Sequence, residues 1–117
     1  MEGALSPMVI VLFRSKLTDA AGDDYQAMAE EMLDRARTMP GFVDFKTYAA
    51  ADGERISVIH WESLETLRPW TDDVRHVMAQ RLGRQKWYEY FRVEVAEIAR
   101  SYGFDRRPST QSEQSQA

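Results

Sequence analysis

The sequence predicts an α+β domain, and three observations lead to that prediction. Four short segments are β-branched or alternate between apolar and polar residues, two longer segments repeat apolar residues at helical spacing, and an Asp-Gly pair separates the second and third strand segments. The order is β-α-β-β-α-β. With right-handed crossovers it gives the ferredoxin-like arrangement, a four-stranded antiparallel sheet with two helices on one face. Another α+β sandwich with the same elements is the alternative.

The first half of the domain holds one strand and one helix. The apolar run MVIVLFRS (8–15) predicts a strand that is buried on both faces. The segment 25–39 predicts an amphipathic helix that Pro40-Gly41 ends. Its apolar residues recur every three or four positions, at Tyr25, Met28, Met32 and Ala36.

A hairpin follows the first helix. The segment FVDFKTYAA (42–50) alternates aromatic and polar residues, which predicts a strand with Phe42 and Tyr48 on one face. The dipeptide Asp52-Gly53 is a strong hairpin signal. The run ISVIHW (56–61) is the returning strand.

The second helical region is expected in two pieces. Ser63 can cap a short helix, LETLRPW, which Pro69 interrupts or bounds. Thr71, Asp72 or Asp73 can cap a second piece, VRHVMAQRLGRQKW. The alternating segment 90–102 predicts the last strand.

Length and composition limit the organisation and the chemistry. The 117 residues suffice for one domain, expected over 8–103, with flexible termini at 1–7 and 104–117. The net charge of −4 disfavours nucleic-acid binding, and the absence of cysteine excludes thiol catalysis and disulfides. The apolar run 8–13 is too short to cross a membrane, and no signal peptide precedes it, so a cytoplasmic location is expected. Two histidines sixteen residues apart do not predict a metal site.

The sheet is predicted to mediate a homodimer. Helices cover only one face of a ferredoxin-like sheet, yet the expected strands carry apolar residues on both faces. In the first strand Val9, Val11 and Phe13 alternate with Met8, Ile10 and Leu12. A large exposed apolar face marks an interface, so two sheets are expected to pack face to face.

The motifs MPGFVDFKTY, ISVIHWES and LRPW, with the Asp-Gly hairpin between the first two, resemble the antibiotic biosynthesis monooxygenase (ABM) family. The resemblance covers about Met8 to Tyr102. It implies a dimeric α+β barrel with a pocket between the sheet and the helices of each subunit. The family includes cofactor-free oxygenases of phenols and anthrones, and haem-degrading monooxygenases.

The resemblance also implies site residues. Trp61 matches the family's tryptophan at the end of the third strand. The haem-degrading branch adds a first-strand asparagine, which falls near Arg14 or Ser15, and a helical histidine, which falls near Gln80. This chain contains no asparagine, and His76 lies one helical turn before Gln80. These departures argue against haem degradation.

Each candidate residue has a structural alternative. Trp61 is a pocket wall or a core residue. His76, with Asp72 and Asp73 one turn earlier, is the candidate base, or else a helix histidine beside acids. Arg14 stabilises an anionic substrate oxygen or is a surface arginine. His60 faces the partner sheet if Trp61 faces the helices, because neighbours in a strand point to opposite faces.

The second helical region and its exit are rich in aromatic residues. Trp70, Trp87 and Tyr88, together with Gln80, are candidate substrate-binding residues, and the aromatic ones are equally well core or dimer contacts. Together with these residues, the resemblance to the ABM family implies a cofactor-independent monooxygenase that uses dioxygen to oxidise an electron-rich aromatic. The alternatives are a haem-binding or haem-degrading monooxygenase, and a non-catalytic dimeric barrel that binds small ligands.

Overall fold

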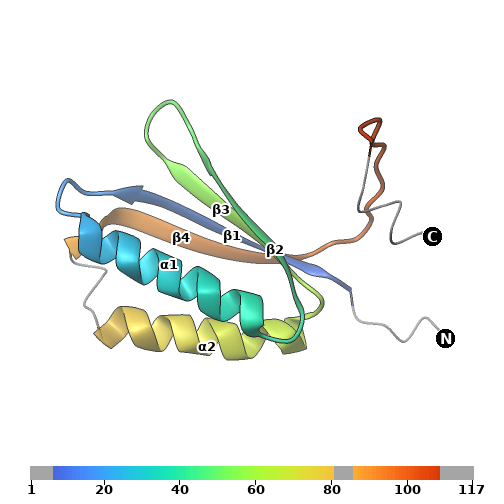
Figure 1. Ribbon diagram of the computed structural model, residues 1–117, viewed down its shortest axis with the longest axis horizontal. Helices are drawn as coiled ribbons and strands as arrows, with labels where there is room; N and C mark the ends of the chain where they lie inside the picture. The colour runs from blue at the N-terminus through green and yellow to red at the C-terminus, as the bar shows by residue number, and fades with distance from the viewer. Residues whose placement is uncertain (1–6, 81–85, 109–117) are drawn as a thin grey trace.

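The computed structural model describes residues 7–80 and 86–108, without the side chains of 76–80. It has the predicted ferredoxin-like order (Figure 1). The elements are β1 (Val9–Leu17), α1 (Asp23–Thr38), β2 (Phe42–Ala49), β3 (Arg55–Trp61), α2 (Leu64–Gln80) and β4 (Tyr88–Glu97). The two helices lie together on one side of the twisted sheet (Figure 1). Neither helix is both long and apolar enough within the described residues to span a membrane.

The sheet has the strand order β2-β3-β1-β4, and all neighbouring strands are antiparallel. Val9 pairs with Trp61 and Val11 pairs with Ile59, so these four residues share the helix-covered face. All four are buried, and they pack with residues of both helices. Residues of the other parity form the face that the subunit leaves open, which we call the open face.

The alternation predicted for β2 is wrong at one position. The register shifts between Phe42 and Asp44, so Val43 is an extra residue in the strand. Phe42 pairs with Trp61 and Phe45 pairs with Ile59, which puts both phenylalanines on the helix-covered face. Tyr48 pairs with Ile56 on the open face. A bulge of one residue therefore moves Phe42 to the opposite face from Tyr48.

The helix α1 buries the predicted stripe of Tyr25, Met28, Met32 and Ala36. It carries acidic residues in its first turn and basic residues in its last turn, which is favourable for the helix dipole. Two apolar clusters fill the space between helices and sheet, one around Trp61 and one around Tyr88. Val74 of α2 packs against both clusters, so the interior is continuous.

The helix α2 is one helix, and the predicted division at Pro69 is wrong. Ser63 caps it as expected, because its Oγ accepts a hydrogen bond from the Thr66 N–H at 3.2 Å. Pro69 lies inside the helix and removes one backbone donor. Leu67 and Trp70, on both sides of the proline, are buried against the sheet. Burial of this continuous apolar face outweighs one lost hydrogen bond.

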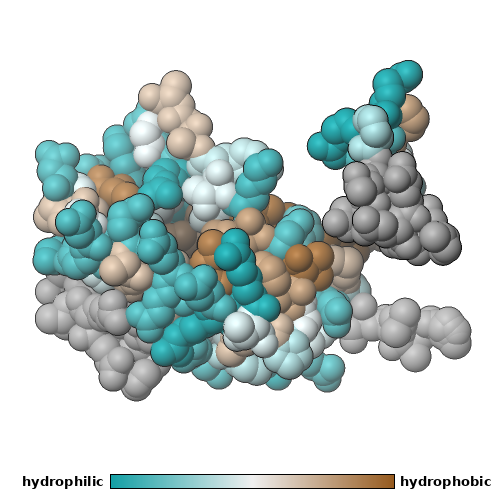
Figure 2. Space-filling view, in the orientation of Figure 1, coloured by the Kyte–Doolittle hydropathy of each residue, from teal (hydrophilic) through white to brown (hydrophobic). Residues whose placement is uncertain are grey.

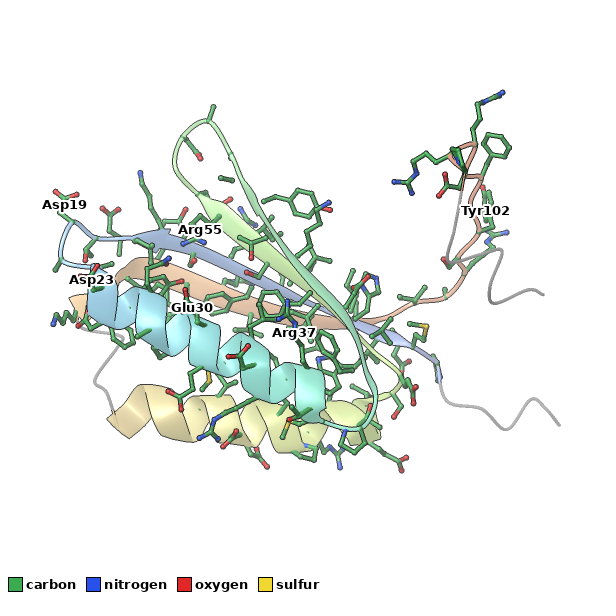
Figure 3. The ribbon with its side chains drawn as sticks, viewed as in Figure 1. Asp19, Asp23, Glu30, Arg37, Arg55 and Tyr102 are labelled. Atoms are coloured by element: carbon green, nitrogen blue, oxygen red, sulfur yellow. The ribbon has the colours of Figure 1, made fainter. Side chains whose placement is uncertain are left out.

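The last strand ends at Glu97 instead of Tyr102. Glu97 pairs with Val9, the first residue of β1, and only the Ile98 N–H bonds further, to the Met8 carbonyl at 2.9 Å. Because β1 begins at Val9, residues after Ile98 have no partner in this strand. The following segment runs away from the domain, and its Tyr102 side chain is 90% exposed (Figures 1 and 3).

Gly41, between α1 and β2, packs against the first turn of α2. It has φ +91°, and a Cβ built on it would clash with the side chain of Thr66 in the first turn of α2. Its carbonyl also accepts the Glu62 N–H at 2.8 Å. Only glycine fits this backbone conformation and this close approach.

Candidate functional site

Trp61 lies in the interior between sheet and helices, where the sequence placed it. Its side chain is fully buried. Its ring is 5.7 Å from that of Phe42, edge to face, and 5.6 Å from that of Trp70. Two of the predicted site residues, Trp61 and Trp70, are therefore in direct contact.

The two indole N–H groups of this pair differ. Trp70 Nε1 donates to the Met32 carbonyl at 3.5 Å. Trp61 Nε1 is buried and has no hydrogen-bond partner in the part of the chain that the structure describes. A buried donor without an acceptor costs free energy. An oxygen atom of a bound ligand would accept this hydrogen bond and remove the cost.

A second aromatic group lies at the other end of the interior and contains the predicted Trp87 and Tyr88. The Tyr25 ring meets Trp87 and Tyr88 edge to face at 5.7 and 5.8 Å, and Phe13 stacks on Phe91 at 5.6 Å. Burial, and then the neighbouring Tyr25 hydroxyl, raise the pKa of Tyr88 far above its usual range. Tyr88 is therefore a neutral phenol at all ordinary pH values.

The helices leave part of their own face of the sheet uncovered. Val93 and Val95 pair with Phe13 and Val11, which puts them on the helix-covered face, yet they are 50% and 47% exposed. Val11 itself is buried. The apolar interior therefore reaches the surface along β4. In one view, Figure 2 shows apolar surface between α1 and the strands, with hydrophilic residues over the outer side of α1.

Arg14 lies on the open face of the sheet, opposite to Trp61. It pairs with Ile56 and Arg92, and its guanidinium donates to Glu54 at 3.2 Å. Tyr90 Oη donates to the same carboxylate at 2.8 Å. Arg14 and Trp61 therefore do not meet one ligand within a subunit, and a role of Arg14 in substrate binding stays a prediction.

His60 is on the open face, as the strand geometry predicts. Its Nδ1 is 2.9 Å from Asp44 Oδ1. The pair bridges β2 and β3 and is away from the helix-covered interior.

The side chains of His76 and Gln80 lie outside the described residues, so their predicted roles stay predictions. Of the two acids expected to orient His76, Asp73 has another partner. Its carboxylate accepts a 2.6 Å hydrogen bond from Arg35, and this contact raises the pKa of Arg35. Arg35 thereby links α1 to α2.

Two other kinds of site are poorly supported. No group of three or more metal-binding side chains occurs within the described residues. A hollow of about 500 Å³ on the outer side of α1 is open and lined by Ala27, Glu30, Glu31, Asp34, Arg35 and Thr38. It is remote from the aromatic interior.

Arg55 is a residue that the sequence reasoning missed. It pairs with Ser15 and Ala49, and therefore lies on the helix-covered face together with Trp61. Parity along β3 was the available signal, because residues 55 and 61 are separated by an even number of positions.

Comparison of the sequence with known proteins identifies a relative of this chain. The chain is 33% identical to the uncharacterized protein YqjZ of Bacillus subtilis over 94 residues, which cover 80% of this chain and 82% of YqjZ. The chain belongs to the YqjZ family. No family model matches it.

Solved structures relate the YqjZ family to the ABM fold. A putative antibiotic biosynthesis monooxygenase from Nitrosomonas europaea has a TM-score of 0.65 and 8% identity, over 84% of this chain and 96% of that one. SnoaB of Streptomyces nogalater, a cofactor-independent oxygenase, has a TM-score of 0.63 and 13% identity, over 82% and 97%. The resemblance to the ABM family predicted from sequence is thus confirmed at the level of the fold.

Proposed function

We propose that this protein is a cofactor-independent monooxygenase of an electron-rich aromatic molecule, such as a phenol or an anthrone. It acts as a homodimer in the cytoplasm. The fold is shared with SnoaB, described as a cofactor-independent oxygenase, and this supports the class of reaction.

The observation that carries the proposal is the unpartnered indole N–H of Trp61. It lies in an interior lined by aromatic rings, and a phenol or ketone oxygen is an acceptor that an aromatic ligand would bring there. Trp70 forms one wall beside it, and Trp87 and Tyr88 belong to the other aromatic group. The half-exposed Val93 and Val95 give this interior an apolar entrance.

The proposed reaction uses the electrons of the substrate alone. His76 removes a proton from the substrate, which leaves a phenolate or carbanion. This anion reduces dioxygen and forms a carbon–oxygen bond, giving a peroxide. Protonation and loss of water then convert the CH₂ group of an anthrone into a carbonyl, so that one oxygen atom enters the product and the other leaves as water. An aromatic interior that excludes water protects the anion and the peroxide from side reactions with water.

The homodimer is supported by the open face. Its centre is apolar, with Ile10 and Leu12 of β1 beside Ile56 and Val58 of β3. His60, Asp44, Arg14 and Glu54 lie around this centre as hydrogen-bonded pairs. An apolar centre with a polar rim is typical of protein interfaces, and a two-fold axis would bring the same patch from each subunit together.

Oxygen uptake with 1,8-dihydroxyanthrone and a panel of hydroquinones tests the function. We expect uptake above the uncatalysed rate by protein that has been dialysed against a chelator, with one oxygen molecule consumed per anthraquinone formed from the anthrone. His76→Ala should lower the rate at least tenfold with little change in melting temperature. Uptake that needs added metal or flavin, or no uptake with any member of the panel, contradicts the proposal.

A further inference from the structure

Arg55 is a cation on the apolar side of the sheet. Across the strands it shares a row with Ser15 of β1 and Phe91 of β4, and the next row holds Ser57, Phe13 and Val93. It is partly buried, while Ser15 beside it is only 3% exposed. Figure 3 shows Arg55 on the sheet above the first half of α1, where the β2–β3 hairpin begins to rise.

The guanidinium of Arg55 has no ion pair or side-chain hydrogen bond within residues 7–80 and 86–108. The other sheet arginines differ. Arg14 pairs with Glu54 at 3.2 Å, and Arg92 pairs with Glu94 at 3.3 Å, both on the open face. The guanidinium donors of Arg55 therefore have no carboxylate among the described residues, which leaves them available to a ligand.

The surroundings of Arg55 suit an aromatic ligand that carries a polar group. Hydroxyl groups lie in the next row, where Ser57 and Thr47 are hydrogen-bonded to each other at 2.8 Å. The aromatic group around Tyr88 is close enough for the charge of Arg55 to act on the Tyr88 phenol, where it opposes the effect of burial on the pKa. A ring could therefore contact aromatic side chains while its substituent reaches the guanidinium.

We propose that Arg55 binds an anionic oxygen, a carboxylate or a phenolate, of the aromatic substrate and selects for it. The planar guanidinium can donate two parallel hydrogen bonds to such a group. This inference rests on the proposed substrate pocket. It gives Arg55 the role that sequence reasoning assigned to Arg14.

A pair of probes of nearly the same shape tests the inference without any oxidation. Naphthalene-2-carboxylate is anionic at pH 7, and naphthalene-2-carboxamide is neutral. Quenching of the three tryptophans reports the binding of each probe to the intact protein. The variants are Arg55→Gln and Arg55→Lys, with Arg92→Gln as the control, because it removes the same charge from the opposite face.

We expect the wild-type protein to bind the carboxylate at least tenfold more tightly than the amide. Arg55→Gln should abolish this preference by weakening the binding of the carboxylate, with no change in the binding of the amide. Arg55→Lys should restore part of the preference, and Arg92→Gln should keep it. Equal binding of both probes by the wild type, no binding of either, or a preference that survives Arg55→Gln overturns the inference. A preference that Arg55→Gln removes, in a protein without oxygen uptake, would refute the oxygenase and leave the anion site standing.

Discussion

The indole rings of Trp61 and Trp70 lie 5.6 Å apart between their centroids, with 34° between their planes, although only Trp70 has a hydrogen bond to its nitrogen. If the proposed function holds, core packing and ligand binding are combined in one pair of side chains. Substitution can separate them, because the ring provides packing and the N–H provides the polar contact.

Trp61→Phe should separate the two roles of Trp61. The ring is partly kept and no protein hydrogen bond is lost, so we expect the free energy of unfolding to fall by only about 1–2 kcal/mol. Oxygen uptake should fall at least tenfold, since a missing donor to a developing oxyanion has effects of that size or larger. Trp61→Ala is the comparison for packing and should cost about 3–5 kcal/mol. Full activity in Trp61→Phe would assign Trp61 to the core alone.

A charge introduced on the open face should disrupt the dimer, whereas a charge on the helix-covered face should not. Val58→Glu puts a carboxylate in the apolar centre of the open face, and we expect it to convert the dimer to a monomer in light scattering at micromolar concentration. Val95→Glu makes the same change on the half-exposed other face of the sheet and should leave the dimer intact. A wild-type monomer would refute the dimer outright.

The two glycines with positive φ should differ in importance. Gly53 has φ +93° and space for a Cβ, so Gly53→Ala should cost about 1–2 kcal/mol of stability from backbone conformation alone. Gly41 has nearly the same φ but faces Thr66, so Gly41→Ala should cost about 1–3 kcal/mol more. Urea unfolding of both variants measures the difference. Equal costs would mean that the loop moves freely away from α2.

Asp24 should stabilise the protein only above acidic pH. The Lys86 ammonium at 2.7 Å, and then the Trp87 indole N–H, lower the pKa of Asp24 from 3.8 to about 2. Trp87 Nε1 makes no hydrogen bond of normal geometry within the described residues, although its N–H still lowers the pKa of the carboxyl group. Because the folded state favours the charged form, the stabilisation is complete above pH 4 and is lost as the pH falls towards 2.

Melting temperatures of Asp24→Asn measure this dependence. The variant should melt below the wild type at pH 7 and together with it at pH 2. Asp19→Asn is the control, as an exposed carboxyl without an ion pair among the described residues. A difference in melting temperature that stays constant with pH would contradict the ion pair.

A haem titration distinguishes the proposed reaction from haem degradation. We expect no Soret band with micromolar haem, because the chain has no asparagine and has Gln80 near the histidine position of the haem-degrading branch. A sharp band that disappears in His76→Ala would favour the haem alternative instead.

Periodicity predicted the elements of the fold because burial of an apolar face determines them. It was right for the stripe of α1 and for the opposite directions of His60 and Trp61, which belong to one strand. Periodicity was wrong about where two elements end, because contacts between residues distant in the sequence determine those ends. The second helix continues through Pro69 because Leu67 and Trp70 both meet the sheet, and the last strand ends where β1 runs out of partners.

Which candidate site residues lie together was harder to predict, since the faces of different strands are related only by their register. Trp61 and Arg14 lie on separate strands, and no pattern within either strand relates them. The pairing of Val9 with Trp61 places Arg14 on the other face. The bulge at Val43 has a similar effect on Phe42.

The contact of Gly41 with Thr66 links the two halves of the chain in a way that constrains their evolution. The loop after α1 packs closely against the first turn of α2. The hydrogen bond from the Glu62 N–H to the Gly41 carbonyl holds the two segments together. We expect an insertion in one loop to displace the first turn of α2 and to weaken the contact of Trp70 with Trp61. Chimaeras between this chain and its relatives should therefore exchange both loops together.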